Sequence, residues 1–326
     1  ELSKVKLLEY KKAMVLYGPP GTGKTYTAME LAKQILVRNI KDIGFKDFNA
    51  LCKSNIKYLQ LHVNYSYENF IAGQVIKDGN IVTQEGFIFK LVEAAQKEVD
   101  KVNKENERIT SENEKVKPKP FVVILDEMNR VEVSRVFGEL FTAIEKRGTQ
   151  VNLTLPDPDD SNKRLTLTIP ENIYFIGTMN EIDFSLEQID FALRRRFIWE
   201  LADYDSESLL EIIRYRLEKD SNNQYKSRVG DFINCCDGVN ETIENHDLLG
   251  EKYHIGHAFF AEITEIIKKI VSEKQTEKQI EKNWYNAKNI LWQISILPTL
   301  DAYCGTMEHS AMEKFIKDCE NKYNGN

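Results

Sequence analysis

Short apolar runs alternate with apolar residues at helical spacing through the first part of the chain. Residues 13–17 form an uninterrupted apolar run that ends at Gly-Pro-Pro-Gly, and residues 28–35 then carry apolar side chains at helical spacing. Because residues 121–125 lack polar positions, we expect a strand buried on both faces of a parallel sheet. Alternating strands and helices predict a layered α/β domain. The other runs that predict strands are residues 58–63, 173–177 and 197–201.

A further apolar pattern between two of these strands predicts a helix. Its apolar residues lie on one stripe, and Gly148 stands where a C-cap glycine would end that helix. The members of the stripe are Val133, Val136, Phe137, Leu140, Phe141 and Ile144.

Two insertions interrupt the alternation of strands and helices. Residues 97–119 are almost all charged or polar and cannot build a core, so we expect a solvated helix end followed by a linker. Residues 150–169 alternate apolar and polar positions on both sides of an acidic, proline-containing stretch, which predicts a β-hairpin with a long turn.

Helical spacing replaces the strand pattern after about residue 203, for example in residues 209–213 and 263–270. The organisation we expect is therefore a large α/β domain over residues 1–203 and a small all-helical domain over residues 204–326. A chain of 326 residues has the length of about two domains.

Charge and cysteine content exclude several classes of protein. The net charge of −7 provides no overall electrostatic footprint for a nucleic-acid backbone, so any DNA contact is expected to be local or delegated to another subunit or domain. Five cysteines, two of them adjacent, argue against a disulfide framework. The absence of a signal peptide or an apolar run of membrane-spanning length predicts a cytoplasmic location. The chain begins without Met, which we interpret as a fragment of a longer protein.

A glycine-rich loop lies between the first predicted strand and the following helix. Residues 18–25, called the phosphate loop below, satisfy the P-loop pattern in the context that it requires. The glycines allow backbone N–H groups to surround a phosphate at a helix N-terminus. Lys24 is expected to reach the β- and γ-phosphates, and the Thr25 hydroxyl to hold Mg²⁺. The alternative, a turn that only resembles the motif, leaves both matching flanks unexplained.

Two carboxylates end the apolar run 121–125, at the edge where α/β sheets bind ligands. Asp126 is the candidate Mg²⁺ partner, and Glu127, which points differently, is the candidate general base. Asn180 ends another predicted strand and could orient the attacking water or the γ-phosphate. Three adjacent arginines, residues 194–196, repel one another unless anions compensate, so one of them is a candidate arginine finger for a neighbouring subunit.

These motifs, in this order, resemble the AAA+ superfamily: Walker A, Walker B, sensor 1, the arginine-finger box and a helical lid. The resemblance implies a three-layer P-loop domain with sheet order 5-1-4-3-2, a ring of subunits and nucleotide held between them. The hairpin at residues 150–169 resembles the pre-sensor insertion of the clade that also contains MoxR-type chaperones.

Five segments resemble McrB-type GTPases more specifically, and Met179-Asn180-Glu181-Ile182-Asp183 fits the MNxxD signature of that family. The other four are residues 65–71, 192–197, 255–260 and 296–298. The resemblance implies that Asn180 and Asp183 position the hydrolytic water and that Arg195 or Arg196 is the finger. It also implies GTP as substrate, with ATP as the alternative, a hexameric ring and an McrC-type nuclease partner. Glu181-Ile182 departs from the small residues that follow Asn180 in the best-known member, which leaves the response to the partner open.

The nucleotide and Mg²⁺ contacts that we expect come mainly from the phosphate loop and its neighbours. His257 has two alternatives, a nucleotide sensor or a satisfied packing residue, and they are evenly balanced. Guanine and adenine cannot be distinguished from the residues alone, and the DNA reader of this family normally lies upstream of residue 1. The complete set of expected contacts is Gly18, Pro19, Pro20, Gly21, Thr22, Gly23, Lys24, Thr25, Tyr26, Asp126 and His257.

Three functions remain to be compared. The first is a ring GTPase that drives a translocating restriction complex. The second is an ATP-dependent remodeller of the MoxR kind, which acts on proteins. The third is a binding module in which nucleotide stabilises an assembly with little hydrolysis, and the intact catalytic side chains argue against it.

Overall fold

The computed structural model describes residues 3–38, 44–111, 115–182, 194–271, 275–305 and 307–325. The chain forms two compact units. The first, the α/β unit, comprises Glu1–Tyr17 and Lys24–Leu201, and the second, the helical unit, comprises Gly18–Gly23 and Ala202–Asn326. The first part of the phosphate loop therefore belongs to the helical unit, although its sequence lies among the elements of the α/β unit.

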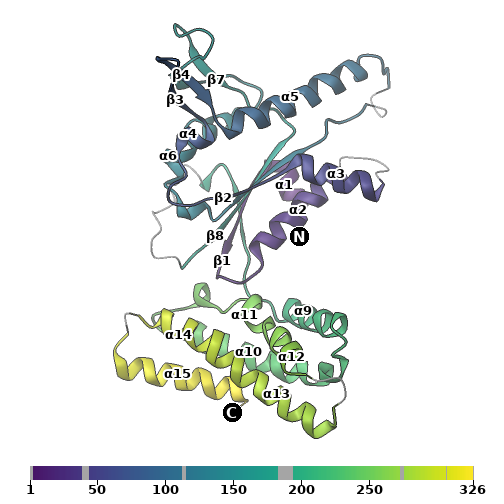
Figure 1. Cartoon of the computed structure of the whole chain (residues 1–326), viewed down its shortest axis with the longest axis vertical. Helices are drawn as coiled ribbons and strands as arrows, with labels where there is room; N and C mark the ends of the chain where they lie inside the picture. The colour runs from purple at the N-terminus through teal and green to yellow at the C-terminus, as the bar shows by residue number, and fades with distance from the viewer. Residues whose placement is uncertain are drawn as a thin grey trace. The chain divides into compact units, whose positions relative to one another are not determined.

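A five-stranded sheet forms the centre of the α/β unit (Figure 1), in the order β2-β5-β8-β1-β9. Numbered along the chain, the sheet strands β1, β2, β5, β8 and β9 are the first to the fifth. Read from β9, the observed order is 5-1-4-3-2, so the predicted order is confirmed. The pairings β1–β9, β2–β5 and β5–β8 are parallel. The strands are β1 (Ala13–Gly18), β2 (Ile56–Gln60), β5 (Phe121–Asp126), β8 (Ile173–Asn180) and β9 (Ile198–Leu201).

Both faces of the sheet are buried because successive side chains of a strand point to opposite faces. In β5, Val123 and Leu125 belong to one apolar cluster, and Val122 and Ile124 belong to the other. Residues of helices α1 (Lys4–Lys11) and α2 (Lys24–Arg38) complete the second cluster. Residues of α5 (Phe87–Asn106), α6 (Val133–Phe137) and α7 (Leu140–Glu145) complete the first. The result is the three-layer domain that the uninterrupted apolar run predicts.

The helices of the α/β unit follow the predicted alternation with strands. Figure 1 shows α1, α2 and α3 on the same side of the sheet. Their bounds are α1 (Lys4–Lys11), α2 (Lys24–Arg38), α3 (Phe45–Asn55), α4 (Tyr67–Phe70), α5 (Phe87–Asn106), the 3-10 helix η2 (Met128–Arg130), α6 (Val133–Phe137) and α7 (Leu140–Glu145).

The single helix predicted from the apolar stripe is wrong, because the stripe is divided between α6 and α7. The break is at Gly138, which has φ 40° and ψ −119°. A Cβ there would lie 2.9 Å from the Tyr67 ring, whose hydroxyl donates to Glu139 at 2.9 Å. Gly148 has a positive φ of 71° but is not the C-cap, which is Lys146. A tertiary contact of the Tyr67 ring thus interrupts a locally continuous helical pattern.

The second strand is shorter than residues 58–63, because its partner ends first. Gln60 pairs with Asp126, the last residue of β5, and Leu61 then donates its N–H to the Asp126 carbonyl at 2.9 Å outside the ladder.

Two hairpins lie outside the central sheet. The predicted one is formed by β6 (Val151–Pro156) and β7 (Arg164–Leu167). The second, formed by β3 (Ala72–Lys77) and β4 (Asn80–Glu85), was not predicted. Its Asp78-Gly79 turn, with positive φ at both residues, is a recognised two-residue hairpin signal in the sequence. The Thr83 hydroxyl donates to the Pro156 carbonyl at 2.8 Å and so links the two hairpins.

After Leu201, the described residues of the helical unit contain no strand. Stacked and edge-on aromatic rings fill its core, including Tyr225, Phe232, Trp284 and Tyr323. Its elements are α9 (Ser206–Lys219), η3 (Asn223–Arg228), α10 (Val229–Glu244), η4 (Glu251–Tyr253), α11 (His257–Ala261), α12 (Ile263–Ile270), α13 (Glu277–Leu291), the π-helical η5 (Trp292–Ile296), α14 (Leu297–Tyr303) and α15 (His309–Asn324).

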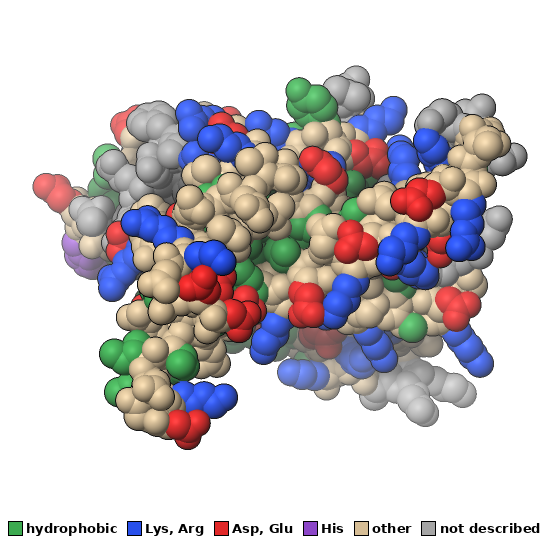
Figure 2. All heavy atoms as spheres, turned by 90° about the horizontal axis from the view of Figure 1, so that it is seen from above, with side chains coloured by type: hydrophobic (Ala, Val, Ile, Leu, Met, Phe, Trp, Pro, Cys, Tyr) green, Lys and Arg blue, Asp and Glu red, His purple; other side chains and the backbone are tan. Residues whose placement is uncertain are grey.

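The surface carries both signs of charge. Figure 2 shows basic and acidic side chains interspersed over the visible face, without a broad region of one sign. Within the described parts of the chain, no helix has the length together with the apolar character needed to cross a bilayer.

Arg147, which follows α7, hydrogen-bonds to backbone carbonyls near the start of strands β1 and β8. Its guanidinium donates to the carbonyls of Pro170 at 3.1 Å, Ile173 at 2.9 Å and Lys12 at 3.4 Å. Desolvation lowers the pKa of Arg147 to about 10, so the group stays charged at neutral pH. Three backbone carbonyls therefore accept a hydrogen bond from one partly buried cation, and those of Lys12 and Pro170 also accept a backbone N–H.

We expect Arg147→Met to lower the free energy of unfolding by about 2–4 kcal/mol, because the substitution removes three hydrogen bonds donated by a partly buried cation. Urea denaturation followed by circular dichroism measures the change. Arg135→Met is the matched control, since the Arg135 side chain is 80% exposed and lies 3.9 Å from Glu132. The control should change stability by less than about 0.5 kcal/mol, and an equal effect of the two substitutions would contradict the role assigned to Arg147.

Candidate functional site

The phosphate loop connects β1 to α2 through a backbone that requires glycine. Gly21 and Gly23 have φ of 77° and 79°, in the left-handed region that side chains disfavour. The Thr22 hydroxyl donates to the Pro19 carbonyl at 3.0 Å and closes the turn. Lys24 is the first residue of α2 and is only 7% exposed. The loop thus has the strand–turn–helix context that its sequence predicts.

Three hydroxyl groups of the α/β unit converge on Asp126 at the carboxyl end of β5. Thr25 and Thr178 donate to its Oδ1 at 2.8 and 2.6 Å, and Tyr58 donates to its Oδ2 at 2.5 Å. Desolvation and the hydrogen bond to Asp126 raise the pKa of Tyr58 to about 12, so the phenol remains a donor at neutral pH. Both carboxylate oxygens are therefore fixed in direction.

Tyr58 and Thr178 were not predicted as site residues from the sequence. The signal for Tyr58 was its place on the neighbouring strand, where it pairs in register with Ile124, two residues before Asp126. Thr178 directly precedes the Met-Asn of the family signature, so its position was also available from the sequence.

Thr25 and Asp126 fit a Mg²⁺ site in their chemistry. The two predicted ligands present oxygen atoms that lie 2.8 Å apart, and hard oxygen donors suit this ion. No cluster of three or more His, Cys, Asp or Glu side chains able to hold a metal is found among the described residues. Mg²⁺ usually keeps several waters and takes only one or two carboxylates plus phosphate oxygens, so one carboxylate and one hydroxyl are compatible with it.

Glu127 occupies a strained backbone position next to Asp126. Its φ of 56° and ψ of 46° are unusual for a residue with a side chain, and such conformations concentrate at functional sites. Gln60 Nε2 lies 3.4 Å from Glu127 Oε2, and Arg130 Nη2 lies 3.7 Å from Oε1. The Glu127 N–H donates to the Thr178 hydroxyl at 3.1 Å. Thr178 therefore links the two carboxylate residues, because it also donates to Asp126.

Thr178→Val is expected to raise the Mg²⁺ concentration for half-maximal nucleotide hydrolysis about 10- to 100-fold, because outer partners orient metal ligands. The substitution keeps the shape of the side chain but removes the donor to Asp126 and the acceptor for the Glu127 N–H. A magnesium titration of the hydrolysis rate measures the shift. The matched control is Thr166→Val, on the hairpin strand β7. An unchanged magnesium requirement in Thr178→Val would show that Thr178 does not orient Asp126.

Asn180, Tyr26 and Asp183 were also predicted at this site. Asn180 is the last residue of β8, and its carbonyl accepts a hydrogen bond from Asn129 Nδ2 at 3.2 Å. The Oδ1 atom of the same Asn129 side chain is buried without a hydrogen-bond partner. Tyr26 is 72% exposed. Asp183 lies outside the described residues.

The candidate finger arginines share one carboxylate, that of Glu145. Arg196 contacts Glu145 Oε2 through Nε at 3.2 Å and Nη2 at 3.1 Å, and its side chain is 11% exposed. Arg195 contacts the same oxygen at 3.4 Å, and its side chain is 64% exposed. Arg194 lies over the Trp199 ring, with its Cζ 5.5 Å from the ring centroid. The three adjacent arginines thus have three different surroundings.

His257 begins α11 in the helical unit and is 7% exposed. Its Nε2 accepts the Asp205 N–H at 2.7 Å, and its ring stacks on Tyr204 with centroids 5.4 Å apart. Desolvation lowers the pKa of His257, so the ring is neutral at neutral pH. These contacts satisfy the imidazole within the helical unit, and both alternatives left open by the sequence remain predictions.

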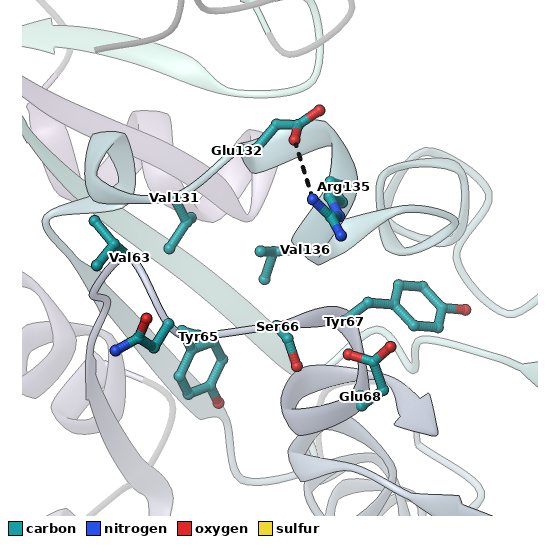
Figure 3. A pocket seen from close by; sticks show the side chains of 10 residues that line it. Val63, Tyr65, Ser66, Tyr67, Glu68, Val131, Glu132, Arg135 and Val136 are labelled. Atoms are coloured by element: carbon teal, nitrogen blue, oxygen red, sulfur yellow. Dashed lines mark ion pairs between the residues drawn. The ribbon is translucent and has the colours of Figure 1, made fainter. Parts of the chain in front are cut away.

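A separate cavity of about 210 Å³ opens in the α/β unit (Figure 3). The Glu132 and Arg135 side chains on its wall point toward each other at 3.9 Å, and a hydrogen bond from Ser66 lowers the pKa of Glu68. None of the predicted site residues lines it. Its lining is Val63, Asn64, Tyr65, Ser66, Tyr67, Glu68, Val131, Glu132, Arg135 and Val136.

Comparison with known proteins gives relatives among restriction enzymes. The chain is 29% identical over 257 residues to the EcoKMcrB subunit of a type IV methyl-directed restriction enzyme of Escherichia coli strain K12, covering 78% of this chain and 49% of the relative. It is 29% identical over 110 residues to the YdiS component of the type II restriction enzyme BsuMI of Bacillus subtilis strain 168, covering 31% of this chain and 30% of that protein. The chain therefore spans about half the length of the first relative and less of the second.

A RuvB mutant of Thermotoga maritima is similar among solved structures, at 12% identity and a TM-score of 0.40, covering 97% of this chain and 82% of that one. The family model described as an AAA domain of the dynein-related subfamily matches residues 13–197, more than half of the chain. The chain therefore belongs to the AAA family, dynein-related subfamily, and within it the resemblance to McrB-type AAA+ proteins is confirmed.

Proposed function

We propose that this chain is the motor part of an McrB-like GTPase that assembles into a ring, a hexamer in the simplest case, and acts on DNA with an McrC-type endonuclease subunit. The observation that carries the catalytic part is the convergence of Thr25, Thr178 and Tyr58 on Asp126. A carboxylate held in this way beside a phosphate loop and a second carboxylate is the arrangement that nucleotide hydrolysis requires.

Each group has a separate task in cleaving the bond between the β- and γ-phosphates. The phosphate loop and Lys24 bind the phosphates, and Thr25 and Asp126 would hold a Mg²⁺, which would supply positive charge to neutralise them. Glu127 takes the proton of the attacking water, because it is the carboxylate that follows the metal ligand and is 29% exposed. Asn180 and Asp183 position that water.

Similarity to McrB-type proteins is what supports GTP, the nuclease partner and DNA as the substrate of the complex. DNA contact is assigned to the partner subunit or to a domain outside this chain, because the net charge is −7 and Figure 2 shows no broad basic region on the visible face.

Steady-state hydrolysis of GTP and of ATP, each with and without an McrC-type nuclease subunit, tests the proposal. We expect GTP to be preferred over ATP by at least about 100-fold in kcat/KM, because a site that hydrogen-bonds to one nucleobase strongly rejects a different nucleobase. The nuclease subunit should increase the GTPase rate. Preference for ATP without any response to the nuclease would instead support a MoxR-like remodeller.

Lys24→Ala tests whether the phosphate loop carries the activity, and it should abolish nucleotide binding. Lys33→Ala is its matched control on the same helix, since Lys33 pairs with Glu30 at 2.6 Å and its side chain is 40% exposed. If nucleotide promotes assembly of the wild-type chain but is not hydrolysed with or without the partner, the chain is a binding module and the proposed GTPase is wrong.

A further inference from the structure

Pro20 and Gly21 of the phosphate loop contact a second segment of the helical unit, to which they themselves belong. Residues 256–259, called the loop clamp below, lie directly against Pro20 and Gly21. Ala258 donates its N–H to the Gly21 carbonyl at 2.8 Å. A Cβ on Gly256 would lie 2.3 Å from the Gly21 carbonyl carbon and 2.4 Å from the Pro20 oxygen. No side chain fits between the two backbones, so glycine is required at position 256.

The loop clamp also leaves no room for a side chain at Gly21. A Cβ on Gly21 would lie 2.7 Å from Cδ2 of the Phe259 ring. Glycine at position 21 is therefore set by the clamp as well as by its φ of 77°. Any movement of the clamp must move the loop, because interiors packed at this density do not deform continuously.

His257 anchors the clamp on two sides. Its imidazole hydrogen-bonds to the Thr22 backbone in the phosphate loop and to the Asp205 backbone at the start of α9. Asp205 is itself the N-cap of α9, where its carboxylate accepts the Ser208 N–H at 2.7 Å. The Tyr204 ring that stacks on His257 donates its hydroxyl to Asp237 of α10 at 2.6 Å. One imidazole thus connects the loop to two helices of the helical unit.

We propose that Gly256 and His257 are positioning residues of the nucleotide site, which hold the backbone of residues 20–22 in its phosphate-binding conformation without touching the nucleotide. The inference rests on the proposed nucleotide-binding function. It assigns His257 a task distinct from base or phosphate sensing. By thermodynamic reciprocity, a nucleotide that orders the loop also stabilises the clamp and the start of α11.

Gly256→Ala should weaken nucleotide binding about 100-fold, because its Cβ displaces the loop by about 1 Å and misplacement on this scale has an effect of that order. Since the loop holds the phosphates before and during reaction, KM should rise while kcat stays within about threefold of wild type. Gly230→Ala, at a helical glycine with nothing within 4 Å, is the matched control. It should bind nucleotide as the wild type does.

Two further variants keep the test independent of any folding defect in Gly256→Ala. His257→Phe keeps the ring against Tyr204 but loses both backbone contacts, whereas His257→Gln keeps a group that can hydrogen-bond. We expect Phe to raise KM by at least about tenfold and Gln to recover part of that loss. A residue needed only for packing would give the reverse order. Wild-type KM in His257→Phe would overturn the proposal.

Hydrogen exchange without nucleotide provides a readout that does not depend on hydrolysis. Amides of residues 21–24 should exchange faster in His257→Phe than in wild type, while those of β5 stay unchanged. Unchanged exchange in the loop would overturn the clamp even if KM rises. Failure of the wild type to bind GTP or ATP would refute the proposed function, whereas normal wild-type binding with unaffected variants refutes the clamp alone.

Discussion

Glu127→Gln is expected to lower nucleotide turnover about 10³-fold while leaving nucleotide affinity within about threefold of wild type. Glutamine preserves the size of the side chain but cannot accept the proton of the attacking water. The neighbours of the carboxylate, Gln60 at 3.4 Å and Arg130 at 3.7 Å, can still contact an amide oxygen, so the local structure should persist. Single-turnover hydrolysis and equilibrium titration with a labelled nucleotide separate the two effects.

Glu132→Gln is the matched control for that experiment. Glu132 lies five residues further along, its side chain is 45% exposed and its ion-pair partner is Arg135 at 3.9 Å. It should hydrolyse nucleotide at the wild-type rate. Wild-type turnover by Glu127→Gln would remove Glu127 as the general base, and loss of binding would show that Glu127 acts on the substrate rather than on the water.

The sheet could be predicted from the sequence because its signals are local. A run such as residues 121–125 leaves no polar face, so both faces must be covered, and β5 is buried at each position. The placement of Asp126 beside Thr25 follows from the same reasoning, since the ends of parallel strands meet at one edge of the sheet. The strand order came from the family resemblance instead.

Contacts between distant residues account for what could not be predicted. The break at Gly138 depends on the Tyr67 ring, which comes from a different segment of the chain. Tyr58 reaches Asp126 only because β2 and β5 pair in one particular register. The approach of Gly256 to Gly21 joins residues that no local pattern connects. The missed β3–β4 hairpin is different, because its Asp78-Gly79 signal was present in the sequence.

Arg195 is the arginine that we expect to act on the nucleotide of a neighbouring subunit. Its side chain is 64% exposed and has one contact with Glu145 at 3.4 Å, whereas Arg196 is 11% exposed and contacts Glu145 through two nitrogens. Replacing the exposed Arg195–Glu145 ion pair with a contact between Arg195 and a phosphate requires little free energy, because exposed ion pairs contribute at most about 1 kcal/mol to stability. Arg195→Ala should therefore lower turnover about 10³-fold or more with nucleotide affinity retained.

Mixing two inactive variants tests whether Arg195 acts in trans. In a ring, an Arg195→Ala subunit has an intact Glu127, and a neighbouring Glu127→Gln subunit can supply the missing arginine. Equal, random mixing should restore about a quarter of the sites, because each active site needs one subunit of each kind in the correct order. Arg196→Ala mixed in the same way should give no recovery, since we expect its loss to weaken the contact with Glu145 within its own subunit. Recovery with Arg196→Ala instead of Arg195→Ala would reverse the assignment, and recovery with neither would place the finger elsewhere.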